Sequence, residues 1–300
     1  MNRLLLLTLI VFASCGPAPT GGKSPGPGRL RPVPLVIATL HPLEYFAERI
    51  AGEWVETEGY YAHDPSDADA LARLQSADLI LLGGAGREGW TSSASLPMAR
   101  TLDTSDGFHA RLIHTQASAP HSHGSGPEHV HHGLDPFTWV DPRNSIDQAS
   151  AILEAIVGLL PEREAALRER FAALESDLAA LDEELVRMSE ENPTILVSHP
   201  SYEYLGKRYG FRFESLDLDP TRELDDAARQ RVRSVLDRDT PIRILLWTQP
   251  PVFELDRELT EMGVAGSLFT TCETPDELPR GQDYLEAQRS NLARLSELLH

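Results

Sequence analysis

Histidine is the residue type in this sequence best suited to chemistry, and it occurs in two settings. His41, His63 and His199 lie in loops beside predicted strands, with His41 and His199 directly after one. Open α/β sheets bind their ligands at the carboxyl ends of the strands. The second setting is a stretch rich in Gly, Ser and Pro that holds five imidazoles, namely His121, His123, His129, His131 and His132. Imidazole nitrogen is a common ligand of transition metals, so this loop is predicted to collect metal ions weakly.

Catalysis is the alternative class for a metal-binding chain, and the sequence argues against it. A metal-dependent hydrolase needs an open coordination position and a placed acid or base. Ser198 and His199 are adjacent in sequence, and neither a Gly-x-Ser-x-Gly elbow nor a His-Glu-x-x-His helix is present. We therefore expect no enzyme. The formal net charge of -19 disfavours a nucleic-acid partner and is compatible with a cation as ligand.

The first residues have the pattern of an export signal. A short apolar stretch follows Arg3 and ends at Phe12-Ala-Ser-Cys15, which resembles a bacterial lipobox. We expect residues 1–15 to be a lipoprotein signal peptide with a lipidated Cys15, and residues 16–33 to be a flexible tether. A plain secretory signal is the alternative. The expected location is the bacterial cell envelope, on the periplasmic or extracytoplasmic face and anchored to the membrane by lipid.

The longest periodic stretch lies between residues 161 and 192. Its apolar residues recur at steps of four and three, at Leu167, Phe171, Leu174, Leu178, Leu181, Leu185 and Met188. This spacing predicts one long helix with a single apolar stripe. A coiled-coil dimer would explain the stripe. Strand and helix alternate both before and after this segment, however, so we predict a spine helix that joins two α/β lobes of a monomer.

The segments on either side of the spine predict the fold. Strands are expected at 35–40, 54–61, 78–83, 194–198, 211–218, 242–247 and 264–269, and helices at 42–52, 65–77, 144–160, 201–209, 225–237, 252–262 and 282–299. The predicted fold is α/β, with two lobes that are each a mostly parallel sheet flanked by helices. The lobes are expected at 34–160, including the His-rich loop at 119–132, and at 193–300.

Several short motifs connect these elements to a known family. They are Pro42-Leu43, His63-Asp-Pro65, the His-rich loop, Asp135-Pro through Trp139 to Asp141-Pro142, and Ser198-His199 leading into Tyr204-Leu-Gly-Lys-Arg-Tyr-Gly210. In this order around a long helix, they resemble the solute-binding subunits of zinc and manganese ABC importers. The resemblance implies a receptor that binds a metal ion between two lobes, Zn²⁺ more than Mn²⁺, and delivers it to the permease.

The resemblance also implies a ligand set of three His and one carboxylate. His63 and His199 match the first and third family ligands, whereas Phe137 stands at the second position and Phe269-Thr-Thr-Cys-Glu273 covers the fourth. A rebuilt site would use His41 together with Cys272 or Glu273, and His131 or His132 could also fold in from the loop. The alternative is a receptor fold that has lost this site and serves as a scaffold or binds another ligand.

Overall fold

The computed structural model describes residues 33–61, 68–115, 133–191, 194–238 and 243–299. Residues 33–300 form one compact unit of the chain. The predicted signal peptide, Cys15, His63 and the His-rich loop therefore lie outside the described residues. Among those that are described, no helix is long and apolar enough to cross a membrane.

Two four-stranded sheets, each entirely parallel, form the framework. The first has the order β2-β1-β3-β4 and the second the order β6-β5-β7-β8. The strands are β1 (Leu35–Ala38), β2 (Glu56–Gly59), β3 (Leu79–Leu82), β4 (Thr101–Asp103), β5 (Thr194–Val197), β6 (Arg212–Ser215), β7 (Ile244–Trp247) and β8 (Ala265–Leu268). The central strands β1, β3 and β7 are buried along their whole length, as expected for continuous apolar runs in a covered parallel sheet.

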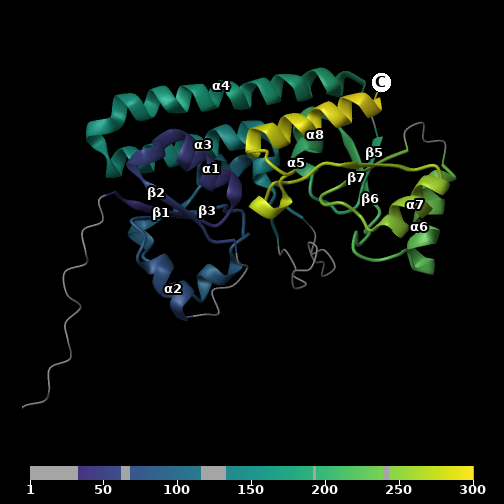
Figure 1. Cartoon of the computed structure of the whole chain (residues 1–300), viewed down its shortest axis with the longest axis horizontal. Coiled ribbons are helices and arrows are strands. Elements are labelled where there is room, and N and C mark those ends of the chain that lie inside the picture. The colour runs from purple at the N-terminus through teal and green to yellow at the C-terminus, as the bar shows by residue number, and fades with distance from the viewer. Residues whose placement is uncertain (1–32, 62–67, 116–132, 192–193, 239–242, 300) are drawn as a thin grey trace, which may run out of the picture. The chain divides into compact units, whose positions relative to one another are not determined.

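Helices accompany both sheets (Figure 1). They are α1 (His41–Ala51), α2 (Ala68–Gln75), α3 (Pro142–Leu159), α4 (Glu164–Met188), α5 (Glu203–Tyr209), α6 (Asp226–Leu236), α7 (Phe253–Glu261) and α8 (Tyr284–Leu299). Short 3-10 turns lie at Gly52–Trp54, Gly89–Ser92, Met98–Arg100, Asp106–Arg111, Thr138–Val140, Pro161–Arg163, Ser189–Glu191 and Pro275–Glu277. The predicted fold class is confirmed. The prediction omitted β4, whose three residues are too few to show an alternating pattern.

Helix α4 is the predicted spine, and its apolar stripe is buried within the chain. Leu167, Leu174, Leu178, Leu181, Leu185 and Met188 are all buried, and Phe171 is partly so. The helix lies alongside α3 and also packs against α1 and α8 (Figure 1). The stripe therefore has partners inside the same molecule, and the coiled-coil dimer is not needed to cover it.

The start of helix α3 fixes the position of residues 135–142, which carry one of the motifs that resemble the family. The Asp141 side chain accepts a hydrogen bond from the Arg143 backbone N–H at 2.9 Å, and Pro142 begins the helix. An Asp N-cap followed by Pro is a strong helix start. Phe137 and Trp139 lie just before this cap, and both are buried with their ring centroids 5.4 Å apart.

Candidate metal site

His41 lies at the carboxyl end of β1, where it opens α1. Its backbone N–H donates to the Glu273 carbonyl at 3.0 Å, so the segments that follow β1 and β8 meet here. The imidazole is 13% exposed, and within the described part of the chain neither ring nitrogen has a hydrogen-bond partner. Buried polar atoms are nearly always paired in folded proteins. An imidazole whose nitrogens are buried and receive no hydrogen bond from the described residues is therefore available to a ligand.

A carboxylate and a tyrosine lie next to His41. Glu44 Oε2 lies 3.6 Å from His41 Nδ1 and accepts a hydrogen bond from the Tyr61 hydroxyl. The Tyr61 and His41 ring centroids are 6.5 Å apart in an edge-on arrangement. A carboxylate next to a metal-binding imidazole fixes the orientation of the ring. The Nε2 atom is thus the nitrogen left for an ion.

His199 occupies the corresponding place in the second sheet. It follows β5 by two residues, and the backbone before it is fixed because Ser198 N–H donates to Leu246 O of β7 at 3.0 Å. The residue is buried, with 6% of its surface exposed. The prediction that His199 lies at a strand end is confirmed, and its role as a ligand stays a prediction.

The segment after β8 holds the two other predicted residues, Cys272 and Glu273. Cys272 is fully buried, and its Sγ accepts a hydrogen bond from Gln288 of α8 at 3.6 Å. Burial raises the pKa of this thiol well above its ordinary value. Zinc binds the thiolate and not the thiol, so the burial of Cys272 disfavours it as a ligand.

Glu273 is already bound by a cation of the protein. Its carboxylate forms an ion pair with Arg87, and the two side chains are only 5% and 7% exposed. The Arg87 guanidinium also lies over the Trp139 ring, 5.9 Å from its centroid. Trp139 in turn donates from Nε1 to the Thr271 carbonyl at 2.8 Å. The fourth expected ligand position is therefore a contact between the loops of the two sheets.

Arg87 is the residue that our sequence reasoning missed. It follows Gly83-Gly-Ala-Gly86, and a run of glycines directly after a buried strand indicates a loop in unusual conformations at the ligand edge of a sheet. Such a loop presents the next side chain at that edge. The loop is tied to β1 through Glu88, whose carboxylate accepts from Thr39 Oγ1 at 2.6 Å and from the Gly83 and Gly84 N–H groups.

Phe137 stands where the resemblance implies a second His ligand, and its ring is buried against Trp139. Taken over the described residues alone, no group of three or more His, Cys, Asp and Glu is close enough to hold a metal ion. His41, His199 and Glu273 thus do not form a complete set among themselves, and the predicted ligand His63 lies outside the described residues.

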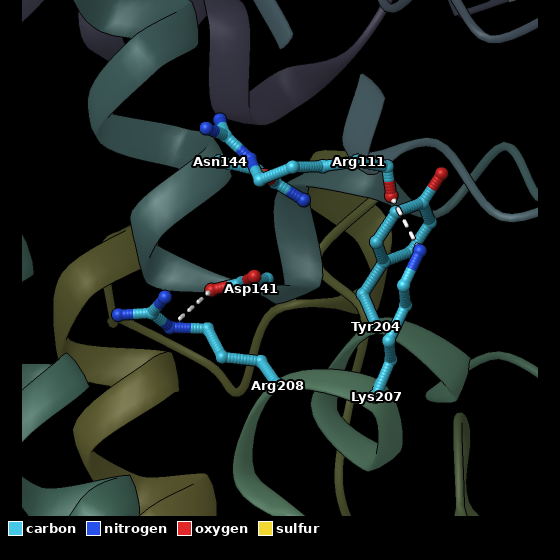
Figure 2. A pocket seen from close by; sticks show the side chains of 6 residues that line it. All are labelled: Arg111, Asp141, Asn144, Tyr204, Lys207 and Arg208. Atoms are coloured by element: carbon cyan, nitrogen blue, oxygen red, sulfur yellow. Dashed lines mark hydrogen bonds and ion pairs between the residues drawn. The ribbon is translucent and has the colours of Figure 1, made fainter. Parts of the chain in front are cut away.

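A second polar site is a pocket of about 250 Å³ between the start of α3 and α5 (Figure 2). It is lined by Arg111, Asp141, Asn144, Tyr204, Lys207 and Arg208. Figure 2 shows Arg208 reaching Asp141, at 3.5 Å, and Lys207 donating to the Arg111 carbonyl at 3.2 Å. Arg111 and Arg208 also pair with Asp147 and Asp182. The charges of this pocket are therefore largely balanced, and none of the predicted ligands lines it.

Comparison with known proteins identifies the family. The profile of the family described as zinc-uptake complex component A, periplasmic, matches residues 36–298, which is most of the chain. The chain belongs to this family of metal-binding solute receptors, which serve ABC importers and are not enzymes. A search of curated protein sequences finds no match.

Solved structures share the fold at low sequence identity. The metal-dependent lipoprotein YcdH from Bacillus subtilis is 20% identical with a TM-score of 0.73, and the match covers 89% of this chain and 99% of that one. The Zn(II)-bound ZnuA-like domain of AdcA from Streptococcus pneumoniae is 18% identical, with a TM-score of 0.72 and the same coverage. The periplasmic zinc-binding protein TroA from Treponema pallidum is 18% identical, with a TM-score of 0.65 over 89% of this chain and 99% of that one.

Proposed function

We propose that this protein is an extracytoplasmic receptor that binds zinc and delivers it to the permease of an ABC importer. The observation that carries the proposal is the His41 imidazole beside Glu44, whose two nitrogens are buried with no hydrogen bond to either from the described residues. Such a group is costly to maintain unless a ligand binds it. Its position at the carboxyl end of β1 is where this architecture binds ligands.

The proposed ligands are His41, His63, His199 and Glu273. Tyr61 is fixed next to His41 through Glu44, and the chain reaches His63 only two residues later. The backbone of Glu273 lies beside His41, because the Glu273 carbonyl accepts a hydrogen bond from the His41 N–H. Three imidazoles and one carboxylate are a tetrahedral set that suits zinc, whereas manganese prefers oxygen ligands.

The remaining parts of the chain fit the same proposal. Lobes at 34–160 and 193–300, joined by the 161–192 spine, would hold the ion between them. A lipid on Cys15 and the 16–33 tether would keep the receptor at the cell envelope, close to the permease. Replacing Cys15 with Ala should abolish acyl labelling and membrane fractionation. The receptor would act as a monomer, since the apolar stripe of α4 is covered within the chain.

The test is zinc analysis of the purified full-length protein, followed by competition titration against a chromophoric chelator. We expect one tight zinc ion, an affinity that falls at least about tenfold in His63→Ala, and no change in His109→Ala, which removes an exposed histidine of the first half. Deleting residues 119–132 should lower the total stoichiometry but leave the tight ion in place. If the deletion removes all tight binding, the His-rich loop is itself the site.

A second candidate is a receptor fold that has lost its metal and acts as a scaffold. Two observations favour it: Phe137 is buried where the resemblance implies a His, and Arg87 already neutralises Glu273. The same titration decides between the candidates. A wild-type protein that binds no zinc at micromolar concentration, with no effect of His63→Ala or His199→Ala, would establish the scaffold.

A further inference from the structure

The ion pair between Arg87 and Glu273 differs from the other ion pairs of the described residues in its burial. It alone has both side chains less than 10% exposed. It also joins segments 186 positions apart in sequence, the loop after β3 and the segment after β8. A buried pair is an expensive way to obtain stability, because both charges must leave water. Its position at the proposed metal site suggests a functional reason.

Each partner follows, within two positions, a residue that has a Cβ and lies in the left-handed backbone region. Ala85 has a φ of 51° between two left-handed glycines, and Cys272, directly before Glu273, has a φ of 58°. Residues with a Cβ adopt this region rarely, and they keep it only where the surrounding structure enforces it. Glu88 does so on one side, by binding the Gly83 and Gly84 N–H groups. The fold thus holds two unfavourable turns that bring these two charges together.

The contacts of the guanidinium leave it able to exchange partners. Its Nε is buried and donates no hydrogen bond to any described residue, although its Nη2 binds Glu273. A buried arginine with an unused donor is held less firmly than one in a fully satisfied network. The other neighbour is the face of Trp139, which attracts a cation without a directional bond. Glu273 can therefore pass from Arg87 to a competing cation that lies nearby.

We propose that Arg87 is an internal competitor of the metal ion, a cation lock that holds Glu273 in the empty receptor and must release it before the carboxylate can bind zinc. This inference rests on the proposed function, and it names Arg87 as the residue that sets metal affinity. In the empty state the pair also links the two loops, so that the receptor stays assembled without an ion. When zinc binds, the metal ion replaces the Arg87 guanidinium at Glu273, and the freed guanidinium stays over Trp139.

Zinc competition titrations on the full-length protein test the lock, with the variants Arg87→Met, Glu273→Gln and their combination. Removing the internal cation with Arg87→Met should raise zinc affinity at least tenfold. Glu273→Gln should weaken binding at least about tenfold more in the Arg87→Met background than in the wild type, because only there is the carboxylate free. Arg238→Met is the matched control, since it removes the same charge from an exposed pair with Glu214 and should change nothing.

A second measurement needs no metal. In excess chelator, Arg87→Met and Glu273→Gln should each lower the melting temperature, and the double variant should lower it by much less than the sum. Additive losses would show that the two side chains do not interact, and would overturn the lock. Arg87→Lys keeps the charge, so this variant should stay folded and bind zinc with an affinity close to that of wild type. It therefore separates an effect of charge from a loss of folding.

Failure of the lock and failure of the proposed function give different results. If Arg87→Met binds zinc within twofold of wild type while His199→Ala still weakens binding, the lock is wrong and the receptor function stands. If wild type binds no zinc but Arg87→Met does, the lock is supported and the natural protein is not a zinc receptor. If neither binds zinc, both proposals are overturned.

Discussion

The two sheets of this protein have the same strand order and differ in the loops that come after their strands. In both, a strand continues into the loop through matching hydrogen bonds: Thr39 N–H donates to Leu81 O, and Ser198 N–H donates to Leu246 O, each at 3.0 Å. The residue that could bind a metal follows within two positions, His41 after Leu40 in the first sheet and His199 directly after Ser198 in the second. Repeating one topology therefore places an imidazole at each edge.

The loops of the two sheets differ in charge. The first sheet contributes a guanidinium from Arg87, and the second contributes the carboxylates of Glu273 and Glu277. Burial raises the pKa of Glu277 to about 7, and the neighbouring Glu273 adds to the rise. Strand order thus sets where a ligand can lie, whereas the loops decide whether that place accepts a cation. Substitutions in each sheet can test the two sides of this comparison.

The largest effect is expected where the sheets are most alike. His199→Ala and His41→Ala each remove one imidazole from the proposed four-ligand site, and each should weaken zinc binding about 100-fold, or about 2.7 kcal/mol. Chelator competition at constant pH measures both. Equal losses would support the equivalence of the two edges. A loss in His199→Ala alone would remove His41 from the ligand set and leave its open nitrogens unexplained.

The second prediction concerns Asp135, where the two halves also meet, because Tyr204 of α5 donates to its carbonyl at 3.0 Å. Burial raises the pKa of this carboxyl from 3.8 to about 7, and its Oδ2 has no partner among the described residues. A raised pKa means that the folded state favours the protonated form. The stability that the Asp135 carboxyl contributes is therefore fully present below about pH 4 and is lost as the pH rises towards 7.

Asp135→Asn should remove that loss. The full shift corresponds to about 4 kcal/mol, and the amide buries a new donor at a cost of about 2 kcal/mol, so the variant should be about 2 kcal/mol more stable at pH 8. Urea denaturation from pH 4 to 8 measures this, and the variant's profile should be flatter. Glu258→Gln is the contrasting control, because the hydrogen-bonded ion pair with Arg229 lowers the pKa of that carboxyl, and its replacement should destabilise at pH 8. A wild-type profile that does not fall between pH 4 and 7 would contradict the assignment.

Phe137→His tests whether the first sheet can regain the imidazole that the resemblance implies. The new side chain should supply a fourth imidazole beside Trp139, in place of the carboxylate that Arg87 holds, and raise zinc affinity at least tenfold, about 1.4 kcal/mol. The lost aromatic contact should cost about 1 to 3 kcal/mol of stability because the ring is buried. Chelator competition with His63→Ala in the same background separates a new site from the old one. No gain in either background would favour the scaffold.

The sequence predicted the framework well because the framework depends on local patterns. Continuous apolar runs at 35–38 and 244–247 and the four-and-three spacing in α4 are visible in the chain itself. The site was less predictable. Arg87 meets Glu273 across 186 positions, and no local pattern indicates which charges will meet at that distance. The resemblance implied a metal ligand at the fourth position, whereas burial and a pairing cation decide how available Glu273 is.

The smallest effects are expected at the two strained turns, and they should have opposite signs. Ala85 is left-handed with a side chain of one carbon, so Ala85→Gly relieves strain at little loss of packing and should stabilise by about 0.5 kcal/mol. Cys272 is left-handed but fully buried against Gln288, so Cys272→Gly relieves the same strain and loses a packed sulfur, with a net cost of about 1 kcal/mol. Urea midpoints at fixed m-value measure both. If Ala85→Gly destabilises as much as Cys272→Gly, the left-handed geometry carries no strain, and packing alone holds both turns.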